Sequence, residues 1–246
     1  MTRVKSAIRQ RVPQLHWAKL RVAKRLAITI HRSMMRPLRR PQLRQALREV
    51  QEVAPALPSP ETIVKLIRAW DNSAAAEPDY LLAVLKHGRD AAGPILECGS
   101  GLTTIALAVY AQQPVISLEN HPGWYRRVAD EMSSLGLAAT GLLHCPLKDY
   151  GSFTWYDPPL SALPKSFSLV VCDGPPLRDR PGGRVGLMPV MGNRLQAGAL
   201  VLVDSDMQVG ERNAIDAWRS GHGLGRSSHE GTTLVLQNTH LQHQAH

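Results

Sequence analysis

The sequence of 246 residues predicts an α/β fold, in which helices cover both faces of a doubly wound, mostly parallel sheet. From Pro94 onward, short apolar segments alternate with helical segments of about 10 to 15 residues, a rhythm typical of parallel strands joined by helices. Near the C-terminus, two strand-like segments are separated only by Gly231, which is too short a connection for a helical crossover. That segment predicts a hairpin and an antiparallel edge strand.

The chain begins with a strongly basic extension. Residues 1–50 contain 14 Lys or Arg and one acid, Glu49, so they carry +13, and the chain total of +9 leaves −4 for residues 51–246. We predict a basic helical arm and linker over residues 1–58, suited to anionic lipid, a polyanionic partner or nucleic acid. Its interleaved Trp and Leu residues favour a membrane surface, although the Arg-rich, acid-poor start also resembles an organelle transit peptide.

No apolar run is long enough to cross a bilayer, and the N-terminus lacks the features of a secretory signal. We therefore expect a cytoplasmic protein, peripheral on the membrane if the arm binds lipid. The cysteines match no zinc pattern and are interpreted as small core residues in a reducing compartment; they are Cys98, Cys145 and Cys172.

The folded domain is predicted over residues 59–238, with N-terminal helices in 59–93, a core in 94–238 and a disordered tail in 239–246. Ser59, Pro60 and Glu61 predict a helix start, because they supply a hydroxyl cap, a first-turn proline and an acid at the positive end of the helix dipole. Further helices are expected at 77–90, 122–136 and around 209–219. Strands are expected at 94–98, 114–118, 139–144, 168–172 and 199–203.

The stretch "ILECGSGLTT" (95–104) runs from a strand through a glycine turn into a helix, which is where a ligand can approach the backbone. The sixth position of a dinucleotide motif is Thr104 here and not glycine, and no Gly-Lys-Ser/Thr follows, so neither a dinucleotide site nor a P-loop is predicted. The strand-end acid Glu97 would repel a pyrophosphate but suits an amino group. Glu119 follows 22 residues later, at the end of the next strand, where a carboxylate can accept hydrogen bonds from ribose hydroxyls.

"LECGSGLTT" and "SLENH" resemble the first two motifs of the class I S-adenosylmethionine-dependent methyltransferases, and the resemblance covers about residues 60–238. It implies a Rossmann-like, seven-stranded sheet and S-adenosylmethionine as cofactor. The third glycine that many members carry is Thr103 in this chain. The cofactor-binding residues that the resemblance implies are Glu97, Gly99, Ser100, Gly101, Thr103, Glu119, Asn120 and Asp173.

The segments "FSLVVCDGPP", "GGR" and "LVLVDSD" resemble a bacterial subgroup of small-molecule or glycan O-methyltransferases. The resemblance implies catalytic roles for Asp173, after the fourth strand of the fold, and for Arg184, which belongs to an arginine-rich loop suited to an anionic acceptor. Two routes to an activated acceptor hydroxyl are open. Asp173 and Asp204 could hold a divalent cation, or Asp173 or a nearby histidine could act as general base without metal. Ser205 departs from the acid or amide expected there, which weakens the metal route.

Two other functions remain open, as does a purely structural role of Asp173 in tying down its turn. One is an RNA methyltransferase whose arm contacts phosphates. Against a base-methylating enzyme, the chain carries Asp-Gly-Pro-Pro-Leu at 173–177 without an aromatic residue to stack a base, and only 5% of its residues are aromatic. The other is a catalytically silent, membrane-attached binding module. The sequence names neither the acceptor nor the oligomeric state.

Overall fold

A computed structural model describes residues 38–71, 76–176, 183–204 and 209–239. Its centre is a seven-stranded sheet in the order β3-β2-β1-β6-β7-β9-β8. The first five of these strands are parallel, whereas β9 is antiparallel to both of its neighbours. The strands are β1 (Ile95–Cys98), β2 (Val115–Glu119), β3 (Leu142–His144), β6 (Phe167–Cys172), β7 (Leu195–Asp204), β8 (Leu224–Glu230) and β9 (Thr233–Asn238).

The predicted fold class is confirmed: the sheet is Rossmann-like, mostly parallel and doubly wound, and each expected strand is present. The predicted hairpin around Gly231 is also confirmed. Its second strand, β9, inserts between β7 and β8, so the hairpin supplies both the edge strand and its antiparallel neighbour. A separate small hairpin, which the sequence pattern did not indicate, is formed by β4 (Leu147–Asp149) and β5 (Thr154–Tyr156).

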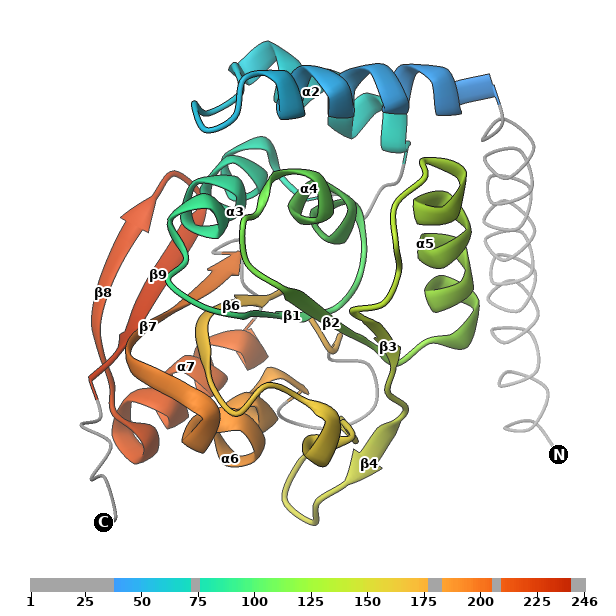
Figure 1. Ribbon diagram of the computed structural model, residues 1–246. Helices are drawn as coiled ribbons and strands as arrows, with labels where there is room; N and C mark the ends of the chain where they lie inside the picture. The colour runs from blue at the N-terminus through green and yellow to red at the C-terminus, as the bar shows by residue number, and fades with distance from the viewer. Residues whose placement is uncertain (1–37, 72–75, 177–182, 205–208, 240–246) are drawn as a thin grey trace, which may run out of the picture.

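Helices cover both faces of the sheet. Figure 1 shows α3 and α4 on one face with further helices stacked over them, and α6 and α7 on the opposite face. Along β1 the side chains alternate between the two sides, since Ile95 packs with residues of α3 and α4 whereas Leu96 and Cys98 pack with residues of α6 and α7. The helices are α2 (Pro60–Trp70), α3 (Pro78–Asp90), α4 (Leu102–Tyr110), α5 (Pro122–Ser134), α6 (Leu187–Met191) and α7 (Val209–His222).

The helix starts that local sequence indicated are present. Ser59 caps α2, because its hydroxyl accepts a hydrogen bond from the backbone N–H of Thr62 at 3.2 Å. Helix α5 ends at a glycine as expected, where Gly136 adopts a φ of +76°. The cysteines are free and buried, which matches their interpretation as core residues.

Part of the segment predicted as an arm belongs to the folded body. Residues 38–52 form a helix whose face of Leu43, Ala46, Leu47 and Val50 is buried in one apolar cluster with residues of α2, α4 and α5. The net charge of residues 1–50 did not indicate this buried face. Apolar residues three or four positions apart lie on one side of a helix, whatever charged residues lie between them. We call this helix and α2 the N-terminal layer.

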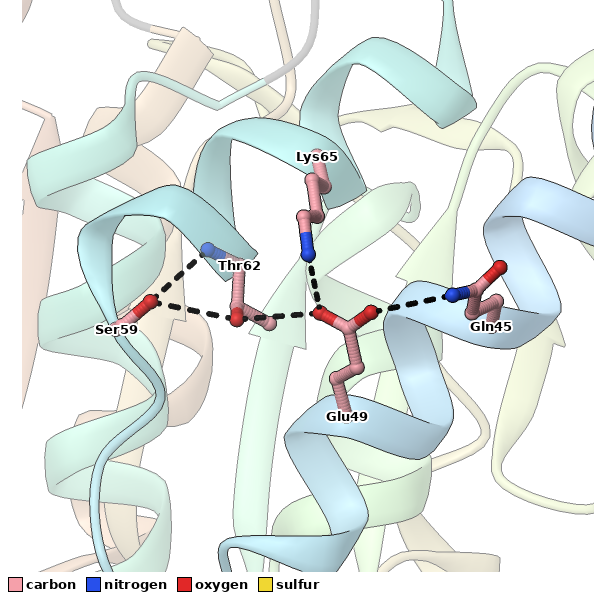
Figure 2. A network of polar contacts seen from close by, with 5 residues as sticks. All are labelled: Gln45, Glu49, Ser59, Thr62 and Lys65. Carbon is pink, nitrogen blue, oxygen red and sulfur yellow. Dashed lines mark hydrogen bonds and ion pairs between the residues drawn. The ribbon is translucent and has the colours of Figure 1, made fainter.

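A polar network also joins the two helices of the N-terminal layer. Figure 2 shows Glu49 accepting hydrogen bonds from Lys65, Thr62 and Gln45, of which the Lys65 contact is shortest, at 3.0 Å. Ser59, the N-cap of α2, lies within 3.4 Å of the Thr62 hydroxyl. The one acid of residues 1–50 therefore anchors the helix of residues 38–52 to the start of α2.

The remainder of the predicted arm, residues 1–37, and tail residues 240–246 lie outside the described residues. The helical arm, its membrane or nucleic-acid partner and the disordered tail thus stay predictions, as do the domain boundaries. No helix in the described ranges is long and apolar enough to cross a membrane.

Candidate functional site

The candidate site lies at the carboxyl ends of β1 and β6, where the strand order reverses. From β1 the chain proceeds outward through β2 and β3 on one side, and later through β6 and β7 on the other. In open α/β sheets, ligands bind in the crevice at this switch point. The turn after β1, residues 99–101 (the glycine turn), and the turn after β6, residues 173–176 (the Asp-Gly-Pro-Pro turn), flank it.

These two turns contact each other through backbone. The carbonyl oxygen of Cys98 accepts hydrogen bonds from the N–H of Asp173 at 3.0 Å and of Gly174 at 2.6 Å. Gly99 has a φ of +94°, and a Cβ added there would lie 3.1 Å from the Gly174 nitrogen. Glycine at position 99 is therefore required by both conformation and space.

Gly101 differs from Gly99, since a Cβ added to it would meet no atom within 4 Å. Its φ of 174° is extended backbone that any residue adopts. The fold therefore has no packing or conformational need for glycine at position 101. The absence of a side chain leaves open space beside the backbone, as expected if a ligand approaches there.

Glu97 is fully buried, and its carboxylate accepts hydrogen bonds from hydroxyl groups around it. Thr103 donates to Oε1, while Thr104 and Ser117 donate to Oε2 at 2.6 Å and 2.5 Å. Burial raises the pKa of Glu97 to about 7, and the hydroxyl donors limit the rise. Thr104 also accepts the Gly101 N–H at 2.8 Å, which ties the glycine turn to the start of α4.

The roles expected for Glu97 and Thr103 at a cofactor stay predictions. In this structure both side chains are buried and hydrogen-bonded to each other. The physical reason is the strand alternation, which turns the Glu97 side chain toward the face covered by α4 instead of toward the sheet edge. Their hydrogen bonds fix the start of α4, which follows the glycine turn.

Glu119 lies at the end of β2, beside the glycine turn, as the spacing predicted. Its Oε2 accepts from the Ser100 N–H at 3.1 Å and from the Ser100 hydroxyl at 2.9 Å, and its Oε1 accepts from the His121 N–H at 2.7 Å. The side chain is 5% exposed, and the neighbouring Asn120 is half-buried. The structure thus brings Ser100, Gly101 and Glu119 together.

Asp173 and Arg184 form a pair at the end of β6. The Arg184 Nη2 donates to the Asp173 carbonyl oxygen at 2.9 Å and lies 3.4 Å from its carboxylate. The Asp173 side chain is 48% exposed, whereas that of Arg184 is 9% exposed. The buried guanidinium of Arg184 therefore positions Asp173 in this structure, and its expected role in clamping an acceptor stays a prediction.

Asp204 ends β7, in register beside the end of β6, so the two predicted metal-binding aspartates follow neighbouring strands. Among the described residues, no group of three or more His, Cys, Asp or Glu side chains lies together as a metal site would require. Residues 205–208 and the loop arginines at 178 and 180 lie outside the described ranges. His144 is exposed and lies against the Tyr125 ring, with 5.6 Å between ring centroids.

Tyr80, on α3, lies near this site, which sequence reasoning did not indicate. Its ring packs with Val171 and Leu202, and two residues further along those strands, on the same side, are Asp173 and Asp204. Its hydroxyl has no hydrogen-bond partner among the described residues, although the side chain is 1% exposed. Burial raises the pKa of Tyr80 well above its ordinary value, and the charge of Asp173 adds to the rise, so the phenol stays neutral.

Replacing Tyr80 by Phe is expected to raise the free energy of unfolding by about 1 kcal/mol, because the change removes a buried polar group that gains no hydrogen bond. Tyr110→Phe is the matched control. The Tyr110 hydroxyl donates to the carbonyl oxygens of Pro55 and Ala56 at 3.2 Å and 2.8 Å, so its loss should lower stability. Urea denaturation of both variants measures whether each substitution raises or lowers the free energy of unfolding. A lower value for Tyr80→Phe than for the wild type would contradict the prediction.

No family model and no curated protein matches the chain. Solved structures with a similar fold include a methyltransferase-like protein from Silicibacter pomeroyi (18% identity, 68% of this chain and 88% of that chain covered, TM-score 0.47). An O-methyltransferase from Bacillus cereus in complex with SAH shows 13% identity, with 77% and 94% covered and a TM-score of 0.44. The 16S rRNA N2 G1207 methyltransferase from Thermus thermophilus shows 14% identity, with 68% and 44% covered and a TM-score of 0.45. Likeness at this level carries no activity over to this chain, and the fold rests on the sheet order itself.

Proposed function

We propose that this chain is an S-adenosylmethionine-dependent methyltransferase that methylates a hydroxyl of a small molecule or glycan. The observation that supports it most is the meeting of Glu119 with the glycine turn at the switch point of the sheet. A carboxylate at the end of β2 suits the two hydroxyls of a ribose. The open space beside Gly101 suits the close approach of a ligand to the backbone.

The strand order supports one direction for the ligand. With the ribose at Glu119 on β2, the other end of the cofactor extends across β1 toward β6, where the half-exposed carboxylate of Asp173 can accept a hydrogen bond from an ammonium group. Asp173 therefore takes over the amino-group contact expected of Glu97. Gly99, Gly101, Ser100, Asn120 and Glu119 remain the proposed cofactor residues.

S-Adenosylmethionine supplies a methyl group on a sulfonium, which is an electrophile without further activation. The chain has to align the acceptor and remove its proton. In the proposed reaction, a lone pair of the acceptor oxygen forms the new C–O bond, the C–S electron pair stays on sulfur, and the hydroxyl proton passes to Asp173. Arg184 holds that aspartate in place, and Asp204 lies on the acceptor side, beyond β6.

Isothermal titration of the full chain with S-adenosylmethionine tests the cofactor, with NAD as the control ligand. We expect saturable binding of the first and none of the second, and a loss of affinity in Glu119→Gln. An absence of S-adenosylmethionine binding by the wild type would overturn the proposed function.

Transfer of a labelled methyl group to a catechol, an aliphatic alcohol and a hexose tests the reaction. We expect transfer to one of these hydroxyl classes. At saturating S-adenosylmethionine, Asp173→Asn should lose about 100-fold or more in rate, because the amide cannot accept the hydroxyl proton, and its affinity for the cofactor should also fall. Undiminished transfer by that variant would reassign Asp173 to tying down its turn. Addition of EDTA separates the two open routes, since a chelator leaves a carboxylate base unaffected.

A second candidate acceptor is RNA, which the +13 charge of residues 1–50 favours. In that case the affinity for a structured RNA should fall steeply with salt concentration. It should also depend on the basic residues of positions 1–37. Salt-insensitive or absent RNA binding would exclude this acceptor.

A further inference from the structure

The indole of Trp124 reaches the glycine turn from α5. Its Nε1 donates a hydrogen bond to the carbonyl oxygen of Ser100 at 2.6 Å. Trp124 lies in the first turn of α5, where its own backbone N–H donates to Nδ1 of the N-cap residue His121 at 3.1 Å. The backbone position of this tryptophan is thereby fixed next to the end of β2.

The Trp124 ring is in turn held by the N-terminal layer. The guanidinium of Arg127 lies 4.5 Å from the centre of the Trp124 ring and 4.8 Å from that of Trp70, which is buried on α2. The two indoles are perpendicular, with centroids 6.2 Å apart. The cation attracts both aromatic rings, so the three side chains form one cluster that joins α2 to α5.

Ser100 links this cluster to the candidate site. Its carbonyl is held by Trp124, while its N–H and hydroxyl both donate to Glu119. Rotation of this part of the glycine turn would break the contacts of Ser100 with Trp124 and with Glu119 together. The orientation of the Glu119 carboxylate therefore depends on Trp124, which contacts the glycine turn through the Ser100 carbonyl oxygen.

We propose that Trp124, held by Arg127 and Trp70, is a positioning residue that keeps Ser100 and Glu119 oriented for the cofactor ribose. The proposal rests on the proposed function, because it assigns Ser100 and Glu119 to the cofactor. It extends that function by making the N-terminal layer a determinant of cofactor affinity.

Trp124→Phe tests the proposal, because it keeps an aromatic ring and removes the N–H donor. We expect the Kd for S-adenosylhomocysteine, measured by titration calorimetry, to rise about three- to ten-fold. Trp218→Phe is the matched control, since the buried Trp218 makes the same type of bond to the Val185 carbonyl oxygen, at 3.0 Å, on the opposite face of the sheet. It should lower the thermal midpoint without changing the Kd.

A double-mutant cycle separates positioning from a general loss of stability. In a Glu119→Gln background, Trp124→Phe should cost a smaller factor in Kd than in the wild type, because its effect passes through that carboxylate. An unchanged Kd in the single variant, or equal factors in both backgrounds, would overturn the proposal. If Trp124→Phe does not fold, Arg127→Met, which keeps both indoles, must raise the Kd in the same cycle or the proposal fails.

The proposed function and this inference fail in different ways. A wild-type chain that does not bind S-adenosylhomocysteine or S-adenosylmethionine contradicts the proposed function itself. A wild-type chain that binds them, with a Trp124→Phe variant that binds equally well, contradicts only the role of Trp124.

Discussion

A Gly101→Ala variant is expected to bind S-adenosylmethionine about 10- to 100-fold more weakly than the wild type, with its free energy of unfolding unchanged. The added methyl group meets no protein atom within 4 Å, and the backbone at Gly101 is extended, so the free protein accommodates alanine. The methyl group then occupies space that the proposed ligand needs. Overpacking of a filled site costs about 1–3 kcal/mol, which gives this range of affinity.

Gly99→Ala provides the contrast within the same turn. Its φ of +94° strains any side chain, and the Cβ would lie 3.1 Å from the Gly174 nitrogen. We expect a loss of about 2–4 kcal/mol in unfolding free energy. Urea denaturation and titration calorimetry on both variants separate the two effects. Equal cofactor affinity of Gly101→Ala and wild type would show that the open space is not used by this ligand.

The stability of the protein is expected to fall by about 3 kcal/mol between pH 4.5 and 7 through Glu97 alone. Burial raises the pKa of this carboxyl from 4.5 to about 7 in the folded protein. Between these two values the folded state binds more protons than the unfolded chain, so the contribution is fully present below pH 4.5 and is lost as pH rises through 7. Well above pH 7, Glu97 adds no further pH dependence to the free energy of unfolding.

Glu97→Gln should remove this fall in unfolding free energy with rising pH, because the amide does not titrate and keeps the size of the side chain. Denaturation of both proteins at pH 5, 6, 7 and 8 gives the difference directly. Glu230→Gln is a flat control. Burial opposes it, but the hydrogen bond from Lys86 and the charge of His87 hold the pKa of Glu230 below its ordinary value, so the pH dependence of this group lies below that range and its removal should leave the slope between pH 5 and 8 unchanged. Parallel curves for wild type and Glu97→Gln would show that Glu97 titrates normally.

The sequence predicted the fold wherever the signal was local. The Ser59 cap, the alternation after Pro94 and the Gly231 hairpin each depend on residues close together in the chain, and all three are present. The pairing of Glu119 with the glycine turn was also accessible, since both follow strands of one parallel sheet and such ends meet at one edge.

The contacts that sequence reasoning missed depend on tertiary packing. The approach of Tyr80 to the end of β6, for example, depends on how α3 packs on the sheet. Trp124 carried no motif, although it follows Glu119 closely. The burial of Glu97 agrees with strand alternation, a signal that was available in the sequence.

The helix of residues 38–52 has a practical consequence for anyone who shortens this protein. Starting the chain at residue 59 would strip Leu43, Leu47 and Val50 from the apolar faces of α2, α4 and α5. A contiguous apolar surface exposed in this way promotes aggregation, so the boundary suggested by charge and proline content would yield an insoluble product.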